Sequence, residues 1–219
     1  MKLDIEDQLQ QIIEISTRKA AIEEWKSSSE KQRAPLYNYR GDHVQQVVNL
    51  AKYIGESTNA NMEILTLASW FHDIAKPGIE GIEITHHGEA SAEIAGDWLA
   101  EAGYDLETSA QVANAVRNHV GLKLKKSLEP IEAQVLWEAD KILKLGLIGV
   151  LQYILNGIRI KPGQSLSDFS QSLKEFLPLA EELTASVVTE RGKEIAKERL
   201  ERLYLLSKML ESELHPQKQ

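Results

Sequence analysis

The sequence predicts an all-α protein. Apolar residues recur every three or four positions along most of the 219-residue chain, which is the spacing of one face of a helix. No segment alternates apolar and polar residues over the length of a strand, and the β-branched residues are dispersed. Residues that start or stop helices, namely Asn, Asp, Pro and Gly, fall between the periodic segments.

Composition bounds the class of protein. Apolar residues make up 42% and charged residues 26%, as in an ordinary globular protein. The excess of 33 acidic over 25 basic residues argues against a broad surface for a nucleic-acid polymer or an anionic membrane. Because the chain has no cysteine, any metal ion must be held by nitrogen and oxygen ligands.

The chain also lacks the sequence features of a secreted or membrane protein. The first residues, MKLDIEDQLQ, have no apolar segment like that of a signal peptide. The longest apolar run, Leu145 to Leu151, is too short to cross a bilayer. We therefore expect a soluble, cytoplasmic protein with no membrane partner.

The first half of the chain predicts three helices. One covers about residues 3 to 25 and is followed by a break through Pro35. The second begins near Asp42, a good N-cap, and has His43 in its first turn. Asn61 can cap the third, which continues to a stop at Pro77 and Gly78.

The second half predicts five more helices. They are expected from His86 to Gly103, from about Leu106 to Asn118, from Pro130 through Leu151, from about Asp168 to Val188 and from Gly192 to Leu214. The expected organisation is an N-terminal helix in residues 1–35, a core in residues 36–160 and a C-terminal helical extension in residues 161–219.

The segment Trp70 to Pro77, WFHDIAKP, places His72 and Asp73 side by side in an apolar helix. Helical spacing turns His72 toward the core, where a buried imidazole beside a carboxylate needs compensation, and a cation is the simplest. His43 and Asp140 are placed inward in the same way on two other helices. Two imidazoles and two carboxylates suit Mn, Fe, Co, Ni or Zn, whereas Mg prefers more oxygen. Taken singly, each residue could instead be a satisfied core histidine or a helix cap.

A local charge inversion lies between Thr108 and Leu128, where the acidic chain has no acid at all. This stretch contains the four basic residues Arg117, Lys123, Lys125 and Lys126. The pattern is typical of a wall that binds an anionic group such as phosphate, and equally of a solvated basic loop.

The ordered motifs resemble those of the HD superfamily of metal-dependent phosphohydrolases. They are RGDH ending at His43, HDIAKP with its His72-Asp73 pair, and WEADKILKLGLIGV containing Asp140 and Lys141, so the resemblance covers about residues 42 to 151. It implies an all-helical HD-domain bundle around a metal site. His43, His72, Asp73 and Asp140 match the metal ligands of the family.

The resemblance implies roles for further residues. Lys76 matches a lysine expected to contact a phosphate oxygen, or else it complements a helix C-terminus. His87 and His119 look like histidines of the binuclear branch, where they would bind a second metal ion or the substrate phosphate, unless they only cap and pack. Two departures bear on this second ion: Ser91 stands where a glycine is common, and His119 stands alone where the branch often has two histidines.

The implied activity is hydrolysis of a phosphoester or phosphoanhydride bond in a nucleotide or similar small substrate, with a divalent ion acidifying water. Asp73 and Lys76 are the predicted catalytic residues, and Glu80, Glu83 or Glu89 could move protons. The predicted substrate contacts are Arg40, Arg117, Lys123 and Lys125. One alternative is an HD-type metal- or nucleotide-binding signalling module without turnover, and another is a helical interaction protein with no site.

The last predicted helix carries an apolar stripe that needs a partner surface. That surface is either the HD core or the same helix of a second subunit, which would make a homodimer. The stripe consists of Ile195, Leu200, Leu203, Leu206 and Leu210.

Overall fold

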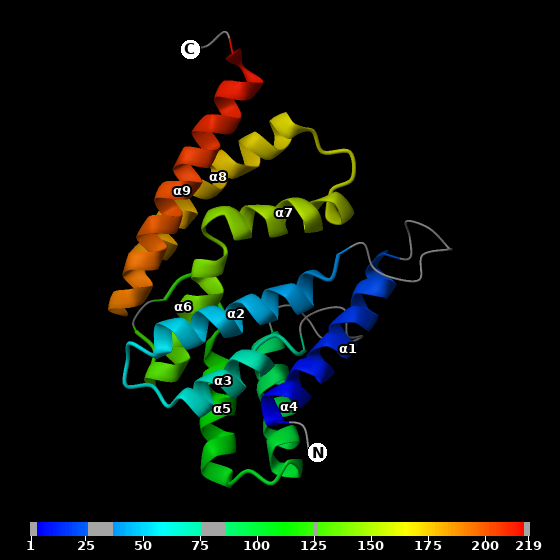
Figure 1. The fold of residues 1–219 in the computed structure, drawn as a ribbon, viewed down its shortest axis with the longest axis vertical. Coiled ribbons are helices and arrows are strands. Elements are labelled where there is room, and N and C mark those ends of the chain that lie inside the picture. Colours follow the sequence, from blue (N-terminus) through cyan, green and yellow to red (C-terminus); the bar gives the residue numbers. More distant parts are fainter. Residues whose placement is uncertain (1–3, 26–36, 76–85, 125–126, 217–219) are drawn as a thin grey trace.

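The computed structural model describes residues 4–25, 37–75, 86–124 and 127–216, and all regular structure within these ranges is helical (Figure 1). The prediction of an all-α fold is confirmed. The helices are α1 (Ile5–Trp25), α2 (Tyr39–Gly55), α3 (Met62–Phe71), α4 (His87–Glu101), α5 (Leu106–Asn118), α6 (Ile131–Leu143), α7 (Gly146–Ile160), α8 (Leu166–Ala185) and α9 (Glu190–Leu214).

The helices α2 to α6 form the centre of the molecule. Helix α2 packs against α3 and α6, α5 packs against α3, α4 and α6, and α1 lies across α2 and α3 (Figure 1). The core between them is built from the apolar faces that the sequence pattern predicts, including the fully buried Val47, Leu65, Val112 and Leu136. This packing brings the start of α2, the end of α3, the start of α4 and the end of α5 toward one another.

The N-cap expected at Asn61 is present, and α8 begins with another side-chain cap. The Asn61 side chain accepts hydrogen bonds from the backbone N–H of Glu63 and Ile64, and Ser165 forms a capping box with Asp168 at the start of α8. Each satisfies donors that the first helical turn leaves free.

The expectation that Asp42 is the N-cap of α2 is wrong. Helix α2 begins at Tyr39, and its N-cap is Asn38, whose side chain accepts from Gly41 N at 3.2 Å. The Asp42 carboxylate instead accepts from the Tyr37 hydroxyl at 2.6 Å and from Gln152 Nε2 of α7 at 2.9 Å. Asp42 thereby ties the start of α2 to α7.

The single helix expected from Pro130 through Leu151 is broken into α6 and α7, which are bent by 67°. Gly146 lies at the break with φ +73°, a left-handed conformation that glycine adopts without steric cost. The break turns Leu147 and Leu151 into exposed residues of α7, away from the buried face that carries Asp140.

The C-terminal helices α8 and α9 pack against each other and against α6, and α9 also packs against α7 (Figure 1). From the stripe predicted on α9, Leu203 is buried, and the three residues Ile195, Leu200 and Leu206 pack against the core. The stripe therefore packs within the chain, where α9 contacts α8, α7 and α6. The division of the chain at residues 35 and 160, and a homodimer, stay predictions.

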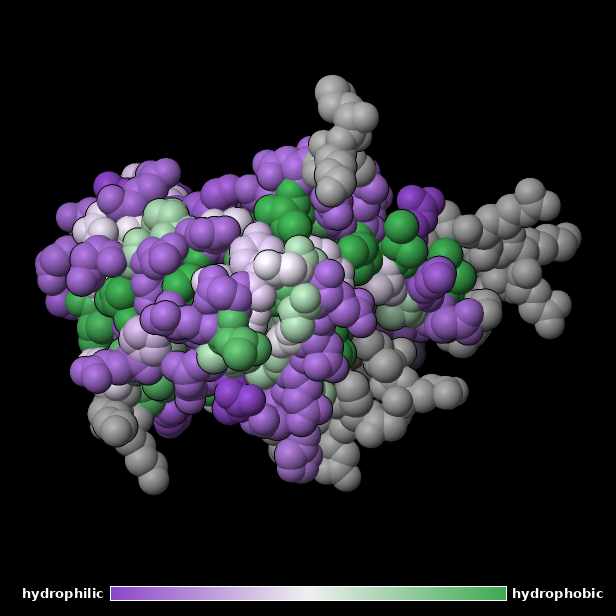
Figure 2. Space-filling model, turned by 90° about the horizontal axis from the view of Figure 1, so that it is seen from below, coloured by the Kyte–Doolittle hydropathy of each residue, from purple (hydrophilic) through white to green (hydrophobic). Residues whose placement is uncertain are grey.

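The surface opposite the C-terminus is mostly hydrophilic, with hydrophobic residues in separate groups among polar ones (Figure 2). In the described part of the chain, no helix by itself has the length and apolar composition needed to cross a bilayer. The pair α6 and α7 reaches that length only across its bend, and almost every residue of α6 is buried inside the protein.

Candidate metal centre

His72 and Asp73 lie in the turn that directly follows α3, so the expectation that α3 continues to Pro77 is wrong. The α-helix ends at Phe71, with His72 as its C-cap. His72 Nδ1 is 2.7 Å from the carbonyl oxygen of Ser69, and Ala75 N donates to Ser91 Oγ of α4 at 3.1 Å. Ser91, which stands where the resemblance leads one to expect glycine, thus fastens this turn to α4.

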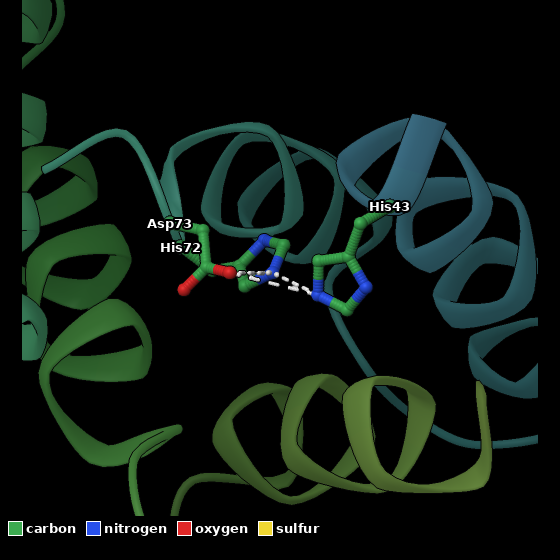
Figure 3. Close-up of side chains that lie close together, drawn as sticks. All are labelled: His43, His72 and Asp73. Atoms are coloured by element: carbon green, nitrogen blue, oxygen red, sulfur yellow. Dashed lines mark hydrogen bonds and ion pairs between the residues drawn. The ribbon is translucent and has the colours of Figure 1, made fainter. Parts of the chain in front are cut away.

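One group of potential metal ligands consists of His43, His72 and Asp73. Figure 3 shows the two imidazoles and the carboxylate turned toward one another, from α2 and from the end of α3. Asp73 Oδ2 lies 3.5 Å from His43 Nε2 and 3.6 Å from His72 Nε2, and the two nitrogens are 3.5 Å apart. The expected convergence of these residues is present in the structure.

A second group lies on the other side of the same carboxylate. Asp73 Oδ1 is 3.6 Å from His87 Nε2 and 3.5 Å from His119 Nε2. His87 is the first residue of α4, and His119 is the C-cap of α5. Their approach depends on Gly88, because a Cβ there would lie only 2.2 Å from Val120 Cγ2.

The hydrogen bonds of two histidines define which ring nitrogen is free to bind a metal. The Nδ1 atoms of His72 and His119 face the carbonyl oxygens of Ser69 and Val116, three residues earlier in each case. A carbonyl only accepts hydrogen bonds, so Nδ1 carries the proton in both rings and Nε2 of the neutral ring carries the lone pair. Both Nε2 lone pairs are directed at Asp73.

Burial keeps the first pair of imidazoles neutral. Burial lowers the pKa of His72 to about 3, and it also lowers the pKa of His43, against the opposite effect of Asp140. His72 has no exposed surface and His43 is 2% exposed. Neutral imidazoles are the form that binds metals.

The donor set fits divalent metal ions. Ligands about 2.0 to 2.2 Å from an ion, at angles of about 90° to 109°, lie about 2.8 to 3.6 Å from one another. The distances of 3.5 and 3.6 Å from Asp73 to the four histidines match this spacing within a few tenths of an ångström. Each group offers two nitrogens and one oxygen, all within 4.8 Å of one another, a set that suits transition metals better than Mg.

Asp140 reaches this centre beside His43. Its Oδ1 lies 3.2 Å from His43 Nε2 and 2.9 Å from Lys144 Nζ, and its Oδ2 pairs with Lys141. Although burial alone would raise it, the pKa of Asp140 is held well below its usual range by Lys141, Lys144 and His43. The two lysines compensate its buried charge, so burial by itself does not require a metal at Asp140, and its role as a ligand stays a prediction.

The predicted substrate contacts in the described part of the chain each pair with an acid. Arg40 pairs with Glu24 of α1, Arg117 Nε lies 2.6 Å from Glu89 Oε2, and Lys123 pairs with Glu182 of α8. These positive charges are therefore partly balanced. Their contact with substrate stays a prediction, and so do the roles of Lys76, Glu80, Glu83 and Lys125, which lie outside the described residues.

A cavity of about 540 Å³ lies next to the first group of ligands, a feature that sequence reasoning missed. His43 and Lys144 form part of its wall, and the rest comes mainly from α7 and α8. The only sequence signal for it is the spacing of Phe169 and Phe176, which places both rings on one face of α8.

The fold matches solved structures over nearly the whole chain. Bacillus subtilis YpgQ, whose structure was solved in complex with ADP, is 19% identical with a TM-score of 0.66 over 95% of this chain and 97% of that chain. An HD-superfamily hydrolase from Bacillus thuringiensis is 21% identical with a TM-score of 0.63 over 95% and 100%. A predicted HD-superfamily hydrolase from an uncultured Thermotogales bacterium is 17% identical with a TM-score of 0.62 over 95% and 92%.

Comparison with curated sequences gives a partial match. The tRNA (cytidine(56)-2'-O)-methyltransferase of Thermoplasma volcanium is 27% identical over 153 residues, which are 64% of this chain and 42% of that protein. The chain thus spans less than half of this relative. The family model of the HD domain matches residues 40–145, which include the five residues of the two histidine groups and also Asp140. Residues 40–145 of this chain therefore form an HD domain, and they include a cluster that could hold a metal ion.

Proposed function

We propose that this chain is a metal-dependent phosphohydrolase that cleaves a phosphoester or phosphoanhydride bond of a nucleotide. The observation that carries the proposal is the position of Asp73, with one carboxylate oxygen directed at His43 and His72 and the other at His87 and His119. His43, His72, Asp73, His87 and His119 are the residues that would hold divalent ions there. Such ions would supply Lewis acidity for a phosphoryl oxygen and for water.

Several residues of the chain would position the metal ligands and the water for this hydrolysis. The carbonyl oxygens of Ser69 and Val116 fix the rings of His72 and His119, which limits reorganisation when a ligand binds. Asp73 would also orient the attacking water, in the role predicted for it as a catalytic residue. The buried, polar character of the cluster excludes bulk water and strengthens electrostatic interactions within it.

Positive charge for the substrate phosphate lies at the cavity next to the cluster. Lys144 lines the cavity together with His43, and its Nζ is 2.9 Å from Asp140 Oδ1. A phosphate at this end would interact with Lys144 and with the bound ions.

A nucleotide is the proposed substrate because two observations support it. The cavity of about 540 Å³ lies within the range of pockets that hold small organic ligands. The structural neighbour YpgQ was solved with ADP. The proposed localisation for this reaction is the cytoplasm.

The test combines metal analysis with a screen for product release. The purified protein is analysed for bound metals, loaded in turn with Mn, Fe, Co, Ni, Zn or Mg, and incubated with nucleoside mono-, di- and triphosphates. Phosphate is measured with and without added inorganic pyrophosphatase, so that both cleavage modes are detected. We expect turnover with a transition metal and no turnover in the Asp73→Ala variant.

Other outcomes separate the alternatives. Full metal content without release of phosphate or pyrophosphate from any nucleotide would favour the signalling module that lacks turnover. A protein that binds no metal under any of these conditions would overturn the proposal.

A further inference from the structure

The cavity beside His43 extends away from the metal centre along helices that follow the matched HD domain. Of its wall, Tyr39 and His43 come from α2, whereas most other residues belong to α7 and α8. The HD match ends at residue 145, before α7 begins at Gly146. Helices α7 and α8, which follow the HD domain in the sequence, therefore form most of the cavity wall.

Four aromatic rings line this cavity. Tyr39 stacks on His43 with ring centroids 5.7 Å apart and an interplanar angle of 17°. Tyr153 of α7 and Phe169 of α8 form a second pair at 5.9 Å and 32°, and Phe176 follows two turns later on α8. Flat side chains of this kind are the usual platform for a nucleobase, because every base has a π-face that can stack.

Polar groups are distributed unevenly around the rings. The side chains of Asn156 and Ser172 lie among them in the wall, where they can hydrogen-bond to the polar edge of a heterocycle. Lys144 lies at the end that His43 shares with the metal centre. An aromatic cavity with amide and hydroxyl groups and a cation at one end suits a nucleoside phosphate better than an alkyl phosphate.

We infer that this cavity binds the nucleoside portion of the substrate, with the base against the aromatic rings of α7 and α8 and the phosphate toward Lys144 and His43. The placement of the phosphate rests on the proposed function, whereas the base would bind whether or not hydrolysis follows. We thereby assign substrate selection to α7 and α8, and chemistry to the HD domain.

Gly157 offers a way to fill the cavity without removing a contact. It lines the cavity, and a Cβ built on it meets only Gln164 Oε1, at 3.8 Å. The variant Gly157→Leu therefore puts a side chain into open space. Its matched control is Gly96→Leu on α4, where a Cβ meets nothing within 4 Å and where no cavity wall is involved. Both changes replace a glycine inside a helix, so their effects on helix propensity are similar.

The probe is a set of nucleosides without phosphate: adenosine, guanosine, cytidine and uridine. Each is titrated into the protein after treatment with a chelator, and binding is followed by saturation-transfer and chemical-shift NMR. We expect at least one nucleoside to bind wild type and Gly96→Leu equally. We expect Gly157→Leu to bind it at least about tenfold more weakly, as for the loss of a stacked base.

A second variant covers the case in which Gly157→Leu does not fold. Phe176→Leu keeps an apolar side chain of similar size and removes the ring, so we expect weaker nucleoside binding in a protein of wild-type helicity. Wild type that binds no nucleoside, or a folded cavity variant with unchanged affinity, would overturn the inference. Nucleoside binding by a protein that hydrolyses no nucleotide would refute the proposed function and leave this inference standing.

Discussion

Asp73 and His119 come from the ends of different helices, α3 and α5, yet Asp73 Oδ1 lies 3.5 Å from His119 Nε2. The same carboxylate reaches His43 through its other oxygen at 3.5 Å. One side chain therefore links two pairs of histidines that four segments of the chain supply. The metal content of the protein should depend on Asp73 more than on any single histidine.

We predict that Asp73→Ala abolishes metal binding at both groups, because both groups lose the carboxylate that they share. The measurement is metal content by mass spectrometry after one purification protocol for all variants. Asp97→Ala, at an exposed position of α4, is the control and should keep the wild-type content. If Asp73→Ala retained a full complement, the assignment of both groups would be wrong.

The second prediction distinguishes one ion from two. His119→Ala removes a ligand from only one group, so we expect metal content to fall from about two ions per chain to about one. His43→Ala should have the same effect through the other group. A wild-type content of one ion that only the His43 variant removes would show that His87 and His119 do not hold a metal, and would leave phosphate binding as their predicted role.

Much of this centre was predictable from the sequence because its residues occur at ordered motifs on strongly periodic helices. The same reasoning failed where a single backbone torsion decides the path of the chain. Gly146 lies inside an apolar run that continues the helical pattern, so nothing in the pattern signals the break before α7. The pattern predicts one continuous helix in place of α6 and α7, so it does not predict the cavity between α7 and α8.

The surroundings of Asp140 show a second limit. Its inward position was predictable from spacing on α6, but spacing does not say which cation compensates it. Lys141, next in sequence, and Lys144, one turn later, both turn toward it. The partner of a buried carboxylate depends on side-chain packing. The spacing of residues along a helix does not specify that packing.

The third prediction concerns Lys123 and its ion pair. If the basic stretch receives substrate charge, Lys123→Glu should raise the Michaelis constant for a phosphorylated substrate more than it lowers kcat, the result of lost uniform binding. The double variant with Glu182→Lys restores the pair to α8 but leaves a negative charge at position 123. A Michaelis constant that returns to the wild-type value in the double variant would show that Lys123 acts only through Glu182.

The fourth prediction follows from the buried histidines. In the folded, metal-free protein the pKa of His72 is about 3, whereas an unfolded histidine has a pKa of about 6.5. As pH falls through about 6.5, the unfolded chain takes up a proton that folded His72 does not. Stability is therefore fully present above this pH and decreases between about pH 6.5 and 3, by about 1.4 kcal/mol per pH unit for each such group.

Urea unfolding of the chelator-treated protein at about pH 7, 6 and 5 measures this slope. His72→Gln should make the slope shallower by nearly one proton, since the variant has no group to protonate at that position. His215→Gln, at the exposed end of α9, is the control. An unchanged slope in His72→Gln would contradict the pKa shift assigned to burial.

The last prediction separates support of the fold from support of the metal. Glu138 of α6 is fully buried, and its Oε1 accepts hydrogen bonds from Val188 N at 2.8 Å and Thr189 N at 3.1 Å, just before α9. Glu138→Leu keeps a side chain of similar size but leaves these donors without their acceptor, which costs about 1 to 3 kcal/mol for each one that water does not reach. We expect a lower free energy of unfolding, whereas Glu194→Leu, at an exposed position of α9, should have little effect. Truncation after Gly163 removes the same contacts and should destabilise the protein further.

Both metal groups lie on α2 to α5 and the turn after α3, so the folded fraction of Glu138→Leu should keep its full metal content. A variant that kept wild-type helicity but lost its metal would show that the C-terminal helices take part in the metal centre itself.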